Sequence, residues 1–342
     1  LVFFIYTFSI NFFTYFNFQI VCKIITVLTL GLSIIANITY FLPFNQIQGW
    51  QSHEYGQIID ALLIAFFLAV CVVFFTIPLT IRFCKKYSIS DKPDDLRKSH
   101  ACDTPNLGGF NIFLGLFLSF TIFGPSASLE KFRFVFLALF LLLVVGIWDD
   151  TRTLNPWIKM IWQLVAAIIM IVLGETYLSD LFGLFGFENL SMSMSYTISI
   201  LLTLTIINGI NLLDGINGLS ATLTIILSFF FFFWFLSIQH YVLALFSCTL
   251  CAATIAFLWY NWTPASIFMG DSGAMILGLS ISFLTLSFLQ TDSEMIASKS
   301  PFAILHAPKI VVSALLLPII DTTRVFFIRL LNGTSPLSAD RN

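Results

Sequence analysis

The stretch FVFLALFLLLVVGIW, residues 134–148, decides the fold, because it is a long apolar run without a charged side chain. Asp149 and Asp150 follow it directly. Similar runs recur along the chain, which is 58% hydrophobic and only 10% charged. A soluble domain carries about 25% charged residues, so water cannot be the main solvent. Backbone groups in lipid must be hydrogen-bonded internally. The sequence therefore predicts an all-α fold, a polytopic transmembrane helix bundle.

A bilayer core of about 30 Å takes roughly 20 apolar residues in a helix. The runs predicted to span it are residues 58–81, 109–124, 134–148, 157–174, 196–210, 219–236, 241–260, 273–290 and 308–331. Residues 24–44 are a candidate for one further span. We therefore divide the chain into an apolar N-terminal extension, residues 1–57, and a transmembrane domain of about nine spans, residues 58–342.

The basic residues are distributed unevenly between the two faces that these spans define. If residues 82–105 lie in the cytoplasm, eleven of the 16 Lys and Arg fall on that face or at the adjoining helix ends. An excess of Lys and Arg is typical of cytoplasmic loops. The other segments that then share the cytoplasmic face are residues 149–159, 211–218, 261–272 and 332–342.

The first polar motif is the pair Asp149 and Asp150 at the end of the span 134–148. Adjacent carboxylates repel each other, so two ionised Asp need a cation or strong donors nearby. Mg²⁺ prefers hard oxygen ligands and shares them with substrate phosphates, and Lys159 offers a point charge for a phosphate. The pair also fits a solvated helix end followed by a cap, and the motif alone leaves both interpretations open.

The second motif places Asn208, Asn211, Asp214 and Asn217 at every third position near the inner end of a span. This spacing keeps the side chains near one helical face. Polar residues at membrane depth are functional candidates. The alternative is a set of hydrogen bonds between helices.

The third motif is FMGDSG, residues 268–273, which sets Asp271 close to two glycines just before an apolar run. Backbone N–H groups at a helix start can bind an anion, so the motif suits a metal or phosphate site. Asp271 could instead simply cap the helix that follows.

The fourth motif is the basic loop DKPDDLRKSH, residues 91–100. His100 could act as an acid or base at neutral pH, and Lys98 could bind an anion. Topology and attraction to anionic lipid headgroups account for most of this positive charge. Taken together, the acidic segments and a Lys on one face of an apolar bundle predict a site for Mg²⁺, a pyrophosphate and a lipid-borne nucleophile.

At these residues the sequence resembles the polyprenyl-phosphate N-acetylhexosamine-1-phosphate transferases, glycosyltransferase family 4, which include the phospho-N-acetylmuramoyl-pentapeptide transferases. The resemblance covers residues 58–342. The motifs that carry it, in order, are DKP…RKSH with TPNLGG, GxxDD with Lys159, NxxNLxDGxxGL, FMGDxG and GxSPxxxDR. The last motif, residues 333–341, is closer to the N-acetylglucosamine-type branch.

The resemblance implies a reaction in which a polyprenyl (undecaprenyl) phosphate attacks the β-phosphorus of a UDP-N-acetylhexosamine such as UDP-N-acetylglucosamine, and UMP leaves. The catalytic residues that it implies are Asp149, Asp150, Lys159 and Asp214. Asp149 and Asp150 would position or deprotonate the lipid phosphate, and Lys159 would neutralise pyrophosphate charge. Mg²⁺, or Mn²⁺ in its place, would be held by Asp271 and Asn211.

The residues implied to bind the nucleotide sugar are Asn208, Asn217, Phe268, Lys98 and His100. Phe268 would stack on uracil and Asn217 would hydrogen-bond to its edge. Many bacterial members carry Asp where this chain has Asn217, but an amide still offers an acceptor oxygen to the uracil N3–H. The His-rich motif and the last spans expected beyond Arg341 are absent from the sequence.

The resemblance also implies a protein of the bacterial inner membrane whose catalytic loops face the cytoplasm and which starts a lipid-linked cell-envelope glycan, such as lipopolysaccharide or a cell-wall polymer. No nucleic-acid partner is expected, and a homodimer is left open. A membrane transporter is the alternative from another class, although it would favour charges inside the spans and repeats paired around the midplane. A truncated non-catalytic paralogue is the third interpretation.

Overall fold

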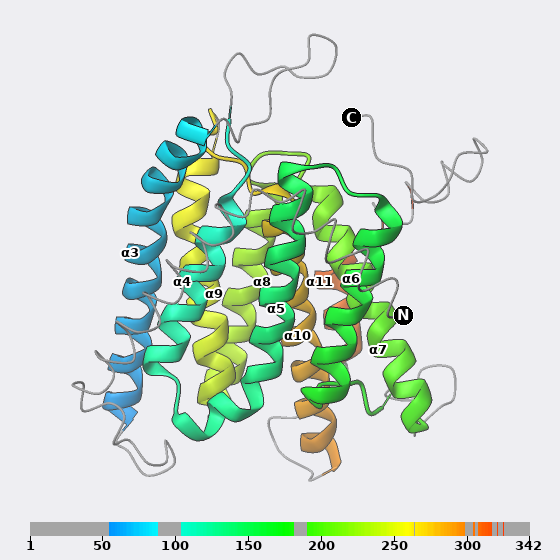
Figure 1. The fold of residues 1–342 in the computed structure, drawn as a ribbon. Helices are drawn as coiled ribbons and strands as arrows, with labels where there is room; N and C mark the ends of the chain where they lie inside the picture. Colours follow the sequence, from blue (N-terminus) through cyan, green and yellow to red (C-terminus); the bar gives the residue numbers. More distant parts are fainter. Residues whose placement is uncertain are drawn as a thin grey trace. The chain divides into compact units, whose positions relative to one another are not determined.

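The chain divides into two compact units, Leu1–Gly49 and Trp50–Asn342. The computed structural model describes residues of the second unit only, namely 55–87, 104–180, 190–262, 264–297, 304, 307–316, 320 and 324. These residues form α-helices and one π-helical turn, and none of them lies in a β-strand (Figure 1). The all-α fold predicted from the sequence is confirmed.

Seven of the described helical segments are long and apolar enough to cross a membrane, where α6 and its π-helical continuation η2 count as one. α4 is apolar but shorter. The elements are α3 (Tyr55–Tyr87), α4 (Gly108–Phe123), α5 (Ser126–Thr151), α6 (Pro156–Ile168), η2 (Ile169–Leu173), α7 (Met192–Leu213), α8 (Leu219–Ser237), α9 (Tyr241–Asn261), α10 (Gly270–Ala297) and α11 (Ala307–Ala314).

Eight of the predicted spans, from residues 58–81 to residues 273–290, coincide with these helices. Of the last predicted span, residues 308–331, the structure describes α11 and little beyond it. The candidate span at residues 24–44 lies outside the described residues.

Helix α10 lies at the centre of the bundle, where it packs against α4, α5, α7 and α8. Its apolar window is buried along its whole length, as expected for a helix that is hydrophobic on all sides. Gly278 brings it close to α7, because a Cβ at this position would lie 2.6 Å from the Cα of Ile207. Small residues allow such close approach of backbones in membrane helices. α10 is therefore held among several neighbouring helices.

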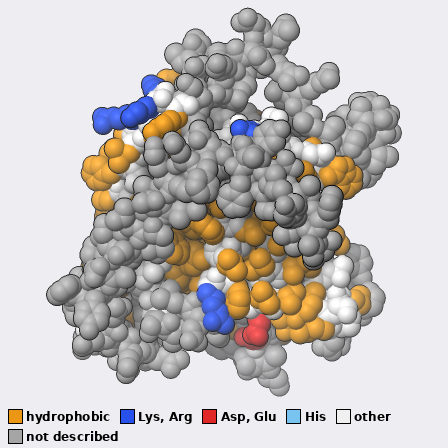
Figure 2. Space-filling model, viewed as in Figure 1, with side chains coloured by type: hydrophobic (Ala, Val, Ile, Leu, Met, Phe, Trp, Pro, Cys, Tyr) orange, Lys and Arg blue, Asp and Glu red, His pale blue; other side chains and the backbone are white. Residues whose placement is uncertain are grey.

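The outer helices expose large apolar side chains. On α3 these include Phe67, Phe75 and Leu79, and on α6 they include Trp157 and Ile161. Figure 2 shows hydrophobic side chains over much of the described surface on one face. Lipid, rather than water, suits a surface of this kind.

The segments that carry the three acidic motifs lie at one end of the bundle, the upper end in Figure 1. They are the turn between α5 and α6, the turn between α7 and α8, and the segment between α9 and α10. The sequence predicted this common location from the alternation of spans, and the structure agrees with it.

Candidate active site

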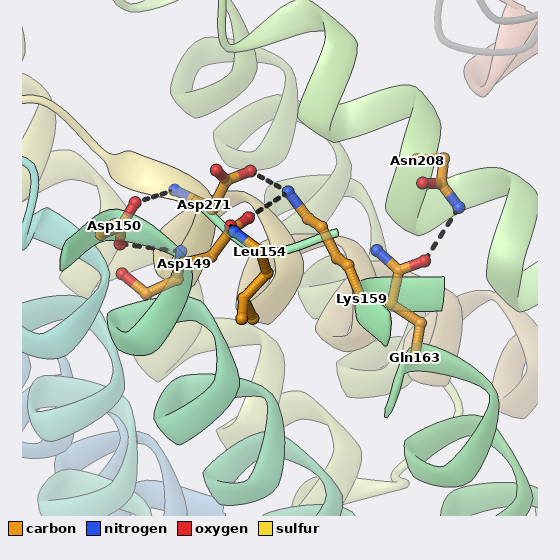
Figure 3. A network of polar contacts seen from close by, with 8 residues as sticks. Asp149, Asp150, Leu154, Lys159, Gln163, Asn208 and Asp271 are labelled. Atoms are coloured by element: carbon orange, nitrogen blue, oxygen red, sulfur yellow. Dashed lines mark hydrogen bonds and ion pairs between the residues drawn. The ribbon is translucent and has the colours of Figure 1, made fainter. Parts of the chain in front are cut away.

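The end of α5, the start of α6 and the start of α10 meet through charged side chains (Figure 3). The Lys159 ammonium lies 3.1 Å from Asp149 Oδ2 and also donates a hydrogen bond to Asp271 Oδ1. One cationic group on α6 thus bridges a carboxylate on α5 and a carboxylate on α10. Hydrogen bonds between charged partners are among the stronger ones in proteins, so this bridge ties the three helix ends together.

The turn between α5 and α6 aims Lys159 at Asp149. Asp149 Oδ1 accepts a hydrogen bond from the Leu154 N–H at 2.6 Å, which closes the turn. Asn155 caps α6, since its side-chain oxygen accepts from the Trp157 N–H at 3.0 Å. Pro156 takes the first helical position, where its missing N–H leaves no hydrogen bond unmade. Asp149 therefore both shapes the turn and receives the Lys that the turn presents.

Asp150, the neighbour of Asp149, faces α10 instead. Its Oδ1 accepts from the Asp271 N–H at 2.6 Å, and its Oδ2 accepts from the Ser272 N–H at 3.1 Å. The first N–H groups of a helix have no acceptor within the helix. A carboxylate from α5 thus supplies acceptors for the first turn of α10.

Glycines allow the backbones to come this close. Gly270 has φ +74°, and a Cβ there would lie 2.1 Å from the Asn106 carbonyl oxygen and 2.7 Å from both Asp150 oxygens. A Cβ at Gly146 of α5 would lie 2.2 Å from the Cα of Ser272. Any side chain at either glycine would push α5 and α10 apart.

The segment before α4 pairs with the segment before α10. The Phe268 N–H donates to the Pro105 carbonyl at 2.8 Å, and the Gly108 and Gly109 N–H groups donate to the carbonyls of Phe268 and Met269, each at 3.0 Å. The TPNLGG and FMGDSG motifs, far apart in the sequence, therefore run side by side at the site.

The three bridged side chains differ in their access to solvent. The side chains of Asp149 and Lys159 are 9% and 15% exposed, whereas that of Asp271 is 33% exposed. Asp271 is therefore the carboxylate that a ligand reaches most easily. With Asp150 also present, three carboxyl groups lie near the single ammonium of Lys159.

The described helices α5 to α10 hold most of the region that matches glycosyl transferase family 4, residues 132–289. The chain is 32% identical over 280 residues to the probable undecaprenyl-phosphate N-acetylglucosaminyl 1-phosphate transferase of Bacillus subtilis, with 81% of this chain and 74% of that protein covered. The chain belongs to glycosyl transferase family 4, the polyprenyl-phosphate N-acetylhexosamine-1-phosphate transferases.

Two further relatives agree with this family 4 membership. The chain is 30% identical over 265 residues to the decaprenyl-phosphate N-acetylglucosaminephosphotransferase of Mycolicibacterium smegmatis, with 72% of this chain and 65% of that protein covered. It is 28% identical over 271 residues to the undecaprenyl-phosphate alpha-N-acetylglucosaminyl 1-phosphate transferase of Escherichia coli K12, with 76% of this chain and 69% of that protein covered. Each of these relatives is named as a transferase, which favours a transferase over a transporter.

Asp214 of this family 4 chain follows α7 and lies near the same charges. Ser220 at the start of α8 donates a hydrogen bond from its hydroxyl to Asp214 Oδ1 at 2.8 Å. Burial raises the pKa of Asp214 to about 7; the Ser220 hydrogen bond opposes this rise and the charge of Asp271 adds to it. Asp214 can therefore gain or lose a proton near neutral pH.

Asn261, to which the sequence assigned no role, connects two of the motifs. Its side-chain oxygen accepts from the Gly218 N–H at 2.8 Å, and its amide nitrogen donates to the Ile267 carbonyl at 3.0 Å. Gly218 has φ +78°, a conformation that glycine adopts without strain. The end of α9 thus holds the turn after Asp214 against the segment that leads to Asp271.

Gln163 is a polar residue of the site that sequence reasoning missed. It lies one helical turn after Lys159, is 1% exposed, and accepts a hydrogen bond from the Asn208 amide at 3.1 Å (Figure 3). Asn208 also donates to the Leu204 carbonyl at 2.8 Å. Within the described residues the Gln163 Nε2 has no hydrogen-bond acceptor. The signal in the sequence was a lone amide in an apolar helix, four residues after a Lys.

The other predicted site residues fall into two groups. Asn211 near the end of α7, Asn217 in the following turn and Phe268 before α10 are half-buried at this end of the bundle. Lys98 and His100 lie outside the described residues. The structure brings Asp149, Asp150, Lys159 and Asp271 together, and the roles assigned to all these residues stay predictions.

The site fits a partly hydrated Mg²⁺ better than a metal enclosed by protein. Within the described ranges, no three or more His, Cys, Asp and Glu side chains gather closely enough to hold a metal ion. Mg²⁺ usually keeps several waters and takes one or two carboxylates plus substrate phosphates. Asp271, with a third of its side chain exposed and other carboxylates close by, fits such a half-open site.

Proposed function

We propose that this protein transfers N-acetylhexosamine 1-phosphate, with N-acetylglucosamine as the first candidate sugar, from its UDP-activated form to a polyprenyl phosphate. The observation that carries the proposal is the Lys159 bridge between Asp149 and Asp271 at one end of an apolar bundle. The names of the relatives support the sugar and the lipid acceptor. The UDP donor follows from the resemblance stated above.

In this reaction an oxygen of the lipid phosphate forms a bond to the β-phosphorus of the UDP-sugar. The bond between that phosphorus and the oxygen bridging to the α-phosphate breaks, and its electrons leave with UMP. The products are polyprenyl-diphosphate-sugar and UMP. Phosphoryl transfer depends mainly on positioning and on stabilising charge, which are the tasks that a cluster of fixed charged groups can perform.

Lys159 would neutralise negative charge of the diphosphate, and its contacts with Asp149 and Asp271 support this role because they hold the ammonium at the site. Asp149, adjacent to it, would position the lipid phosphate or accept its proton. Asp271 and Asn211 would hold Mg²⁺ or Mn²⁺. When bound, the metal would supply charge neutralisation and Lewis-acid assistance to the departure of UMP.

The nucleotide sugar would contact the residues around this centre. Phe268 would stack on uracil and Asn217 would hydrogen-bond to its edge. Asp214, with a pKa of about 7, would be able to exchange a proton near the reacting groups. The remaining predicted contacts to the nucleotide sugar are those of Asn208, Lys98 and His100.

The site would face the cytoplasm from the bacterial inner membrane. Lys85 and Lys86 stand in the last turn of α3, which ends at the same end of the bundle as the site (Figure 1). Basic residues at the end of a span favour the cytoplasmic side. A UDP-sugar made in the cytoplasm could then reach the site without crossing the membrane.

The test is a transfer assay on the full chain in membranes, with undecaprenyl phosphate and a panel of radiolabelled UDP-sugars. We expect UDP-N-acetylglucosamine to give a labelled lipid and UMP in equal amounts, only when Mg²⁺ or Mn²⁺ is added. Asp271→Asn should lose at least about 100-fold in rate, the scale of removing one group that stabilises charge in a transition state.

The matched control is Asp60→Asn, the same substitution at an exposed position in the second turn of α3. It should transfer sugar at the wild-type rate. UMP release by Asp271→Asn at a near-normal rate, or no lipid-linked product from any UDP-sugar with the wild type, would refute the proposal.

A further inference from the structure

Asp149 and Asp150 are neighbours in the sequence, but their carboxylates contact different helices. Asp149 pairs with Lys159 on α6, whereas both oxygens of Asp150 accept backbone N–H groups of α10. In a helix, successive side chains point about 100° apart, so the two carboxylates cannot face one target equally. The contacts of Asp150 are with a helix end, not with the charged side chains.

Asp150 accepts hydrogen bonds from backbone N–H groups that have no acceptor within α10. The first N–H groups of a helix lack intrahelical partners, and an anion near them is favoured by the helix dipole. Asp150 reaches the N–H of Asp271 at 2.6 Å and that of Ser272 at 3.1 Å. A carboxylate on a different helix thus fulfils the role that an N-cap residue plays locally in other helices.

The same contact determines where the Asp271 carboxylate lies. Asp150 holds the backbone nitrogen of the residue whose side chain pairs with Lys159. A shift of this backbone would move the Asp271 carboxylate away from Lys159 and from any ligand bound there. The geometry therefore connects Asp150 to the reacting groups through Asp271.

The glycines near Asp150 show that α5 and the start of α10 are packed too closely for a side chain to fit between them. A Cβ at Gly270 would lie 2.7 Å from both Asp150 oxygens, and a Cβ at Gly146 would lie 2.2 Å from the Ser272 Cα. Contacts below 3.0 Å require neighbouring atoms to move. The packing of α5 against the first turn of α10 thus leaves the Asp150 carboxylate directed at the backbone.

We propose that Asp150 is a positioning residue that fixes the first turn of α10, and with it the Asp271 carboxylate, rather than the group that takes the proton of the lipid phosphate. The hydrogen-bonding part of this inference stands on the contacts alone. Its consequence for catalysis rests on the proposed function. The two parts therefore need separate measurements.

The first measurement is hydrogen–deuterium exchange by mass spectrometry on the full, substrate-free chain in detergent. In Asp150→Ala the amides of residues 270–274 should exchange about 10- to 100-fold faster than in the wild type, the factor that corresponds to losing a hydrogen bond to a charged acceptor. Asp150→Asn keeps one acceptor oxygen and should lie between the two. Asp149→Asn, the matched control, should leave this segment unchanged.

The second measurement is transfer as a function of pH and Mg²⁺ concentration. If Asp150 is a positioning residue, the Asp150→Asn variant should need more Mg²⁺ for its half-maximal rate and should keep the acidic limb of the wild-type pH profile. The Asp150→Ala variant should be slower still. Gly270→Ala alters the same contact without removing a carboxylate, and it should show the same increase in Mg²⁺ requirement.

Unchanged exchange at residues 270–274 in Asp150→Ala overturns the inference, provided that size-exclusion chromatography shows the variant to be folded; if Asp150→Ala does not fold, unchanged exchange in Asp150→Asn overturns it. Equal inactivity of the Asn and Ala variants, with the acidic limb lost, also overturns it and favours a proton acceptor. If the wild type itself transfers no sugar, only the proposed function fails. The exchange measurement still shows whether Asp150 holds the first turn of α10, because it needs no transfer activity.

Discussion

Replacing Lys159 by Met should destabilise the protein as well as inactivate it. The substitution keeps an unbranched side chain of similar length but removes the ammonium between Asp149 and Asp271. Breaking a buried ion pair from one side costs about 3–5 kcal/mol, because the remaining charge is left uncompensated. Since Asp271 is 33% exposed, water screens part of this penalty, and we expect a loss near the lower limit, about 3 kcal/mol.

The assay is thermal unfolding of the full chain in one detergent, from pH 5 to pH 8. A loss of this size should lower the Tm at pH 8 by on the order of 5 °C. The deficit should shrink towards pH 5, since protonation of the carboxylates removes the uncompensated charge. Lys159→Arg keeps the charge and should lose much less stability.

Lys85→Met, the same substitution at an exposed position in the last turn of α3, is the matched control and should change the stability by less than about 0.5 kcal/mol. An unchanged Tm for Lys159→Met at pH 8 would refute the reasoning. So would a deficit that is the same at every pH, because the lost free energy would then come from packing rather than from charge.

Two further predictions concern residues beside this bridge. Because burial raises the pKa of Asp214 to about 7, above the ordinary Asp value of about 3.9, the folded state holds this proton more tightly than the unfolded chain. The contribution of Asp214 to stability is therefore full below about pH 4 and is lost as the pH rises from there through about 7. Asp214→Asn should therefore be as stable as the wild type at about pH 4 and should flatten the decline in Tm between about pH 4 and pH 7; parallel pH curves would contradict this. Gln163→Leu should change stability by less than about 1 kcal/mol, since it removes both a hydrogen bond to Asn208 and a buried donor without an acceptor. It should raise the KM for the UDP-sugar more than it lowers kcat, and a loss confined to kcat would show that Asn208 needs no such support.

The helices could be predicted from the sequence because lipid imposes one strong rule, that a span must be apolar and helical. The predicted span 157–174 matches α6 with η2, Pro156–Leu173, almost to the residue. Where a helix continues past its apolar run, the span predicted from hydropathy ends before the helix does. α3 runs on through Lys85 and Lys86 to Tyr87, and α10 runs on through the buried Asp292 to Ala297.

The candidate site could be predicted only as a set of residues at one end of the bundle. Charge at span ends, in loops that alternate between faces, indicated that Asp149, Lys159 and Asp271 would gather. The pairing of Lys159 with both carboxylates depends on the turn after α5 and on the packing of α10, which no local pattern reveals. Gln163 was missed for a related reason, because a single amide in an apolar helix carries no periodic signal until its neighbour on α7 is known.

The Asp149-Asp150 pair shows that a motif can predict where a site lies without showing which contact each of its members makes. Read as a sequence, two adjacent carboxylates suggest a joint role, such as binding one cation or one phosphate. At the end of α5 the two side chains contact different helices. Asp149 pairs with Lys159 on α6, and Asp150 accepts hydrogen bonds from the first N–H groups of α10. In the proposed reaction Asp149 acts on the lipid phosphate, and the helix that carries Asp271 has to be held beside it. The positioning role proposed for Asp150 meets that need, although only Asp149 of the pair faces the charged side chain of Lys159.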